Sequence, residues 1–258
     1  MTRRLTFYAA LLAAWQALHV WGPWPPYLLP GPLQVLESLI AGFADRTFLI
    51  GIWVSLRRLA IGYALSLVLG VALGLWVGRV RWAGDTVGSL LLGLQTLPSI
   101  CWLPLAIIWF GLSEAAIQFV VIMGALLAIA IHTDDGVKNI PPIYIKAGRN
   151  MGARGAALLW RVLLPAALPS ILSGMKLGWS FAWRSLMAAE LLYVSMGLGQ
   201  LLMMGRELND MAQVVAVMMV IIALGLMVDH MIFGKLERGV RRRWGLLDAA
   251  GKARASQS

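Results

Sequence analysis

Long runs of apolar residues, separated by short polar stretches, dominate the chain. A helix needs about 20 mostly apolar residues to cross the hydrocarbon core of a bilayer. Six runs approach or exceed that length: Leu5–Gly22, Leu59–Gly78, Val87–Gly111, Ala115–His132, Leu168–Leu192 and Met211–Phe233. Pro98 and Pro104 lie inside the third run, which is therefore expected to be kinked. The pattern predicts an all-α membrane protein with six transmembrane helices.

The first run has two interpretations, because a basic start followed by an apolar stretch is shared by anchor helices and signal peptides. Arg3 and Arg4 precede this run. It is longer than a usual signal core and ends in the bulky sequence Trp21–Trp24. We favour a retained N-terminal anchor helix within residues 1–30.

The stretch Leu33–Gly42 is too short to cross a bilayer, but its apolar residues recur at helical spacing. This pattern predicts a short amphipathic helix on the membrane surface. The chain then divides into the anchor helix, an extracytoplasmic amphipathic segment, a membrane-embedded core with a polar loop at 133–167, and a basic tail. Their residue ranges are 1–30, 31–58, 59–233 and 234–258.

Composition excludes the soluble classes of protein. Apolar residues make up 60% of the chain and charged residues 13%, against about 45–50% and about 25% in ordinary soluble domains. A soluble enzyme would lack the polar side chains to cover its surface, and intrinsic disorder requires low hydrophobicity. The single cysteine, Cys101, cannot form an internal disulfide.

The net charge of +10 indicates how the chain is oriented in the membrane. With both termini in the cytoplasm, 16 of the 22 Lys and Arg residues fall on cytoplasmic segments and only 4 outside, as the positive-inside bias requires. This distribution predicts a multi-pass protein of the cell (inner) membrane and argues against nucleic acid as a partner. Arg57 and Arg58 abut the second run on its outer side, and we expect them to snorkel to headgroups.

The loop at 133–167, between the fourth and fifth runs, is too polar to lie in hydrocarbon. Residues Ile143–Asn150 are expected to form a short helix, Gly152 a turn, and Ala153–Leu163 a second helix. Two short helices that meet at a glycine make a compact projection whose apolar residues could fill a partner's groove.

The residues of this loop carry a resemblance to a known family. Lys146-Ala147-Gly148 is followed by three residues, Gly152, nine residues, and then Val162-Leu163-Leu164-Pro165. This spacing resembles the signature of ABC-importer permeases: Glu-Ala-Ala, three residues, Gly, nine residues, Ile, any residue, Leu-Pro. Lys146 stands where the family has Glu, and Gly148 where it usually has the second Ala.

Further segments look like the nitrate/sulfonate/taurine/bicarbonate branch of these permeases. They are Ser55–Arg58, Leu97-Pro98, Trp102–Leu105, Trp109–Gly111, Leu164–Pro169, Ala182-Trp183 and Ala188–Glu190. The resemblance implies a membrane subunit that forms a homodimer with a second copy. It also implies two cytoplasmic ATPase subunits and an extracytoplasmic solute-binding protein as partners. It also implies that the loop is the coupling element that docks on the ATPase. The residues implied are Lys146, Ala147, Gly148, Arg149, Gly152, Ala153, Leu164 and Pro165.

The chain carries no phosphate-binding loop of its own. Gly234-Lys235 and Gly251-Lys252 lack both the upstream glycine and the hydroxyl residue of the Gly-x-x-x-x-Gly-Lys-Ser/Thr motif. We therefore expect no catalytic residues and no cofactor on this chain, with ATP and Mg²⁺ bound by the partner ATPase.

Ionisable residues at membrane depth are costly and are functional candidates. Lys176, Ser180 and Arg184 are each four residues apart on one helical face, and Glu190 lies six residues beyond Arg184. One interpretation is a cationic face that lines the path of an anion such as nitrate, bicarbonate or an organosulfonate. In the other, Lys176 snorkels and Arg184 pairs with Glu190 of a second copy or with another helix.

Rival functions remain to be weighed against a small-anion importer. A vitamin-type or aromatic solute is one alternative cargo. A secondary transporter would need an internal repeat or a midplane ion site, and an intramembrane enzyme would need a catalytic constellation at depth. The cluster His132–Asp135 has no second His or Cys nearby, so we interpret it as a solvated helix end and predict no metal site.

Overall fold

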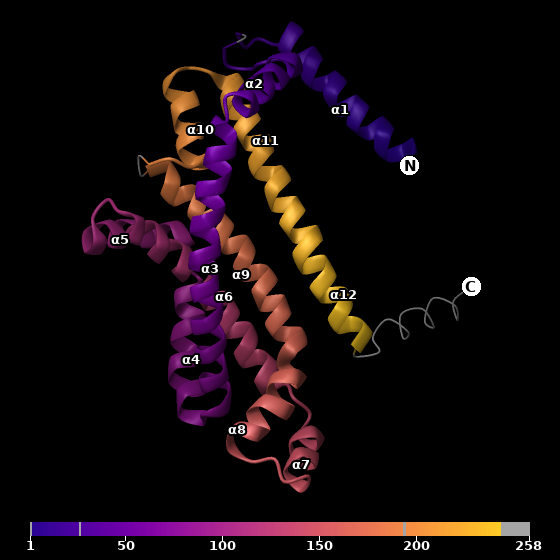
Figure 1. Ribbon diagram of the computed structural model, residues 1–258, viewed down its shortest axis with the longest axis vertical. Helices are drawn as coiled ribbons and strands as arrows, with labels where there is room; N and C mark the ends of the chain where they lie inside the picture. The colour runs from indigo at the N-terminus through magenta and orange to yellow at the C-terminus, as the bar shows by residue number, and fades with distance from the viewer. Residues whose placement is uncertain (1, 26, 193–194, 244–258) are drawn as a thin grey trace. The chain divides into compact units, whose positions relative to one another are not determined.

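The computed structural model describes residues 2–25, 27–192 and 195–243, where every regular element is helical (Figure 1). The elements, in order, are α1 (Thr2–Trp21), α2 (Pro32–Ala44), α3 (Thr47–Arg79), α4 (Arg81–Gln95), η1 (Ser99–Trp102), α5 (Leu103–Phe110), α6 (Glu114–Lys138), α7 (Pro142–Asn150), α8 (Gly155–Leu158), η2 (Leu159–Leu163), α9 (Leu164–Leu192), α10 (Leu198–Glu207), α11 (Met211–Val228), η3 (Asp229–Phe233) and α12 (Gly234–Arg243). Residues 244–258 of the predicted basic tail lie outside the described residues.

The chain forms two compact units. The first unit holds residues 1–58 and 187–225, and the second holds residues 59–186 and 226–258. The long helices α3, α9 and α11 each contribute to both units.

The described residues contain four helical segments long and apolar enough to cross a membrane: Thr47–Arg79, Glu114–Lys138, Gly155–Leu192 and Met211–Val240. A fifth candidate is the pair Arg81–Gln95 and Ser99–Phe110, which is bent by 102°. The predicted all-helical membrane fold is therefore present. The first predicted run is a helix, α1, but its apolar part, Leu5–Trp21, is shorter than the other candidate spans.

The start of the second span was predicted wrongly. Helix α3 begins at Thr47, not at Leu59, so Arg58 lies inside the helix and is 5% exposed rather than snorkelling to headgroups. The Thr47 amide donates a hydrogen bond of 2.8 Å to Asp45 Oδ1. This bond lowers the pKa of the exposed Asp45 carboxyl below its usual 3.8. Asp45 thereby marks the true helix start, which the arginines at 57 and 58 obscured in the apolar pattern.

The third predicted span is broken, not merely kinked. Helix α4 ends at Gln95, Pro98 precedes η1, and α5 follows at a sharp angle. Proline has no N–H to continue the helical ladder, and it restricts the residue before it to extended backbone. In Figure 1, α4 runs alongside the second-unit part of α3 while α5 projects away.

Glycines spaced four residues apart let the second-unit part of α3 approach α6 closely. A Cβ built at Gly70 would lie 3.0 Å from Ile129, and one at Gly78 would lie 2.9 Å from Val137. Helix α9 packs on the same helix in the same way, since a Cβ at Gly178 would lie 2.8 Å from Ile129. Helix α6 is thus the central helix of the second unit.

The polar loop connects the end of α6 to the start of α9 in the second unit (Figure 1). Helix α7 covers Pro142–Asn150, and Gly152 adopts a positive φ of 84° in the turn that follows. The next helix is shorter than predicted: α8 ends at Leu158, and a π-helical turn then joins it to α9. A buried apolar cluster anchors this end of the unit, formed by Val137, Ile140, Leu163, Ala167 and Ile171.

Candidate functional site

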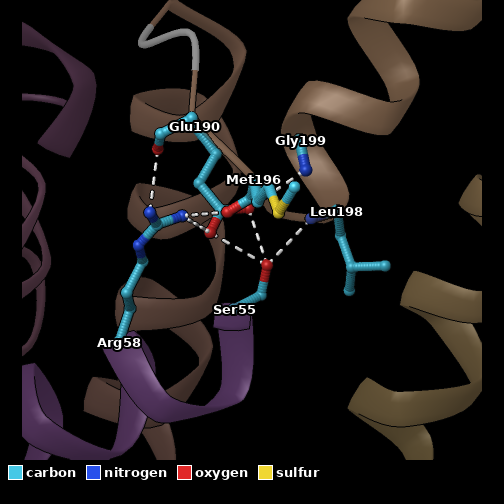
Figure 2. Close-up of polar contacts among 7 residues, drawn as sticks. Ser55, Arg58, Glu190, Met196, Leu198 and Gly199 are labelled. Carbon is cyan, nitrogen blue, oxygen red and sulfur yellow. Dashed lines mark hydrogen bonds and ion pairs between the residues drawn. The ribbon is translucent and has the colours of Figure 1, made fainter. Parts of the chain in front are cut away.

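A buried ion pair joins α3 to the end of α9 in the first unit (Figure 2). Arg58 Nη1 donates to Glu190 Oε1 at 2.9 Å, and the two side chains are 6% and 0% exposed. The same guanidinium reaches past α9, donating to the Met196 carbonyl at 2.8 Å and, through Nη2, to Ser195 Oγ at 2.8 Å. Arg58 therefore fixes both the carboxylate and the segment that follows α9.

The Glu190 carboxylate also organises the start of α10. Ser55 Oγ donates to the carboxylate, at 2.7 Å from Oε2, and accepts the Leu198 amide at 2.9 Å. The Gly199 amide donates to Glu190 Oε2 at 3.0 Å. A carboxylate at a helix N-terminus satisfies amides that have no partner within the helix. Glu190 thus acts as the cap of α10.

Glu190 was expected on the sequence alone to lie in a translocation path, or to pair with Arg184. Its carboxylate is instead occupied by Ser55, Arg58 and the start of α10. Sequence reasoning missed Ser55 and Arg58 as its partners, because they lie 135 and 132 residues away in the chain. The available signal was their spacing of three, which puts both on one face of a helix.

The predicted cationic face on α9 is divided between two cavities of the second unit. Lys176 Nζ lies 3.2 Å from Asp229 Oδ1, and both side chains are about half exposed, at 47% and 38%. Lys176 and Ser180 line a cavity of about 680 Å³ together with Phe233 and other residues of α9 and α12. Lys176 therefore already has a counter-charge.

Arg184 lines a different cavity of about 240 Å³, at the break between α4 and α5. Its Nε donates to the Ser180 carbonyl at 3.1 Å, and its Cζ lies 5.0 Å from the centroid of the Phe181 ring. Within the described part of the chain, no carboxylate forms an ion pair with Arg184. The cavity is also lined by Gln95, Thr96, Leu97, Pro98, Ser99, Trp102, Met123, Gly124, Leu127 and Phe181.

The loop residues implied by the family resemblance lie at the surface of the second unit. Lys146, Ala147, Arg149, Gly152 and Pro165 are exposed, Ala153 and Leu164 are partly buried, and Gly148 is buried. Around them, large apolar side chains are also exposed: Ile143, Tyr144, Met151 and Trp160. A surface that combines cations with uncovered apolar side chains is typical of a protein interface.

Gly148 has a packing role that accounts for the absence of the family's alanine. A Cβ at this position would lie 2.8 Å from Val162 Cγ2.

Among the described residues, no group of three or more His, Cys, Asp and Glu side chains is placed to hold a metal ion.

Several long apolar helices, ionisable side chains within them and an exposed polar loop define the membrane subunit of a transport system. Residues 66–242 match the family described as binding-protein-dependent transport system inner membrane component, and the chain belongs to this family. The resemblance seen in the loop signature is confirmed. The chain is accordingly a permease subunit of an ABC importer rather than an enzyme.

Two relatives and one solved structure illustrate the similarity. The chain is 32% identical over 232 residues to a putative ABC transporter permease of Methanocaldococcus jannaschii, covering 88% of this chain and 86% of that protein. It is 32% identical over 196 residues to the taurine transport system permease protein TauC of Escherichia coli K12, covering 74% and 71%. A chain of the methionine ABC transporter MetNI, in an inward-facing conformation, shares the fold with a TM-score of 0.64 and 19% identity, covering 75% of this chain and 96% of that one.

Other relatives are named after anions. They are the nitrate import permease protein NrtB of Synechocystis, a putative aliphatic sulfonates permease SsuC of Bacillus subtilis and the bicarbonate permease CmpB of Synechococcus elongatus, at 28%, 27% and 29% identity.

Proposed function

We propose that this permease forms the membrane path of a small anion, such as nitrate, bicarbonate or an organosulfonate, which a solute-binding protein delivers. The observation that carries the proposal is Arg184, a cation in an apolar helix that lines a cavity without a carboxylate partner among the described residues. Charged groups at such positions mark ion pathways. The names of the relatives support the same class of cargo.

The proposed assembly contains two copies of this chain, two cytoplasmic ATPase subunits and the binding protein. ATP and Mg²⁺ belong to the ATPase. In this proposal α7 and the turn at Gly152 form the coupling element, and the exposed Lys146, Arg149 and Tyr144 supply its contact surface. Six spans with both termini in the cytoplasm would put this element on the ATPase side, consistent with the excess of basic residues on those segments.

Transport by the reconstituted complex tests the proposal. We expect ATP-dependent uptake of labelled nitrate, bicarbonate or ethanesulfonate into proteoliposomes that contain the permease, the ATPase and the binding protein. In Arg184→Gln, uptake should fall at least about tenfold, since a hydrogen bond to a charged group contributes about 1.5–3 kcal/mol. The matched control is Arg206→Gln, which removes an exposed arginine of α10 in the first unit.

Two results would contradict the proposal. One is full uptake of the anion by Arg184→Gln, which would remove this residue from the path. The other is ATP-dependent uptake of only uncharged or cationic solutes by the intact complex, which would replace the class of cargo.

A further inference from the structure

We propose that the 240 Å³ cavity at the break between α4 and α5 is a binding subsite for a small oxoanion, in which Arg184 supplies the charge and the broken span supplies neutral hydrogen-bond donors. The inference rests on the proposed function, because it names the place where the imported anion contacts this chain. It assigns new roles to Gln95, Ser99 and Trp102.

The guanidinium of Arg184 is held in place, but most of its donors are left over. An arginine has five N–H donors. One, on Nε, is bound to the Ser180 carbonyl, and the Phe181 ring lies against the guanidinium carbon. No described hydrogen bond occupies the terminal nitrogens. The planar guanidinium is held at Nε, and its terminal nitrogens are directed so that they can bind two oxygens of a carboxylate-like or sulfonate-like group.

Two described acids of the second unit form ion pairs, but neither of them pairs with Arg184. Asp134 pairs with Lys138 at 2.7 Å, and Asp229 pairs with Lys176 at 3.2 Å. None of the described residues that line the cavity is acidic. An arginine in an apolar helix is costly without a partner, so a mobile anion that visits the cavity would supply the missing charge.

Three other side chains that line the cavity can donate hydrogen bonds: the amide of Gln95, the hydroxyl of Ser99 and the indole N–H of Trp102. All three are partly buried. Thr96 also lines the cavity, but its hydroxyl donates to the Gly93 carbonyl at 2.7 Å and is therefore used locally. A set dominated by donors suits an oxoanion, whose oxygens mainly accept hydrogen bonds.

The remaining walls of the cavity are expected to strengthen the binding of an anion. Leu97, Pro98, Met123, Leu127 and Phe181 are apolar, and a low local dielectric increases the attraction between an anion and the guanidinium. At about 30 Å³ per water, a cavity of this size holds about eight waters. It therefore has room for nitrate, bicarbonate or a short alkyl sulfonate.

The position of the break explains why these groups meet. A continuous helix would bury the side chains of residues 95–99 against its neighbours or expose them to lipid. The 102° bend instead places Gln95, at the end of α4, and Ser99, at the start of η1, on the same cavity as Arg184 of α9.

Cys101 provides a reporter for this subsite, because it is the only cysteine of the chain, is exposed, and adjoins Trp102. The full chain in lipid nanodiscs is labelled there with an environment-sensitive fluorophore. Sodium nitrate, bicarbonate or ethanesulfonate is then titrated at constant ionic strength, with gluconate as the balancing anion. We expect a saturable change in emission, and an accompanying rise in Tm that does not depend on the label.

The variants separate the proposed contacts. Arg184→Gln should weaken apparent anion affinity at least about tenfold, and Gln95→Leu or Ser99→Ala by about three- to tenfold, as expected for charged and neutral hydrogen bonds. Arg206→Gln is the control and should bind like the parent chain.

Three outcomes would overturn the subsite. The first is an anion affinity of Arg184→Gln equal to that of the parent chain, and the second is an emission change that rises linearly with every salt. The third is a parent chain that does not respond to anions while Arg184→Gln changes from dimer to monomer. The last would assign the counter-charge to a second copy. Saturable binding combined with no anion uptake by the complete importer would reject the proposed function and leave the subsite standing. Anion uptake that depends on Arg184, without anion binding at this cavity, would reject the subsite and leave the proposed function standing.

Discussion

Two arginines within apolar helices have opposite surroundings in this permease. Arg58, in the first unit, is buried and donates to a carboxylate, a carbonyl and a hydroxyl. Arg184, in the second unit, is accessible, and its one described hydrogen bond goes to the carbonyl four residues earlier on its own helix. The comparison teaches that an arginine in an apolar helix is informative only together with its partners. A fully paired cation holds the fold, and an open one is available for a ligand.

The largest effect that tests this comparison is expected at Glu190. Glu190→Ala leaves Arg58 buried without its counter-charge and removes the cap of α10, so we expect the free energy of unfolding to fall by about 3–5 kcal/mol. Thermal unfolding of the purified chain in detergent measures the loss. Arg184→Ala is the matched variant and should cost less than about 1 kcal/mol.

Replacing both members of the buried pair sharpens the same test. Arg58→Met combined with Glu190→Met should recover part of the stability lost in Glu190→Ala, because no unpaired charge remains. Equal small losses in Glu190→Ala and Arg184→Ala would remove the distinction between the two arginines.

A smaller effect is expected where glycine allows α10 to approach Glu190. A Cβ at Gly199 would lie 2.5 Å from the Glu190 Cβ, and overpacking of this kind costs about 1–3 kcal/mol. Gly199→Ala should therefore lower the Tm. Gly239→Ala, on α12, where a new Cβ meets nothing within 4 Å, is the control and should not lower it. A neutral Gly199→Ala would show that the capped start of α10 is not rigid.

The smallest effect is expected at Lys176 and Asp229, since about half-exposed ion pairs contribute about 0–1 kcal/mol. A double-mutant cycle with Lys176→Gln and Asp229→Asn measures the coupling of the pair in thermal unfolding. We expect a coupling energy below about 1 kcal/mol. A value as large as that of a buried pair would mean that Lys176 belongs with Arg58 as a structural cation.

The sequence predicted the features that depend on local pattern. The apolar runs located α6, α9 and α11, and Gly152 marked the turn after α7. Each of these follows from residues within a few turns of one another. The loop signature identified the family for the same reason, since its spacing is contained in one short stretch.

Features that depend on distant residues were not readable from the pattern. Arg57 and Arg58 appeared to bound the second apolar run, because the acid that neutralises Arg58 lies far away in the chain, at position 190. The two prolines predicted a kink, but neither the 102° bend nor the grouping of Gln95 and Ser99 with Arg184 follows from the spacing within one span. Lys176, Ser180 and Arg184 share one face of α9, but Lys176 and Ser180 line one cavity and Arg184 lines another. The helices that form the other walls of each cavity cannot be identified from the pattern of α9.

The cap that Glu190 provides for α10 has a consequence for how this chain tolerates changes in length. The carboxylate bonds to the Gly199 amide nine residues later, while Arg58 holds the Met196 carbonyl between them. An inserted residue in this connection would displace one bonded group from a buried network. Engineered epitope tags and natural insertions are therefore expected to be poorly tolerated between α9 and α10.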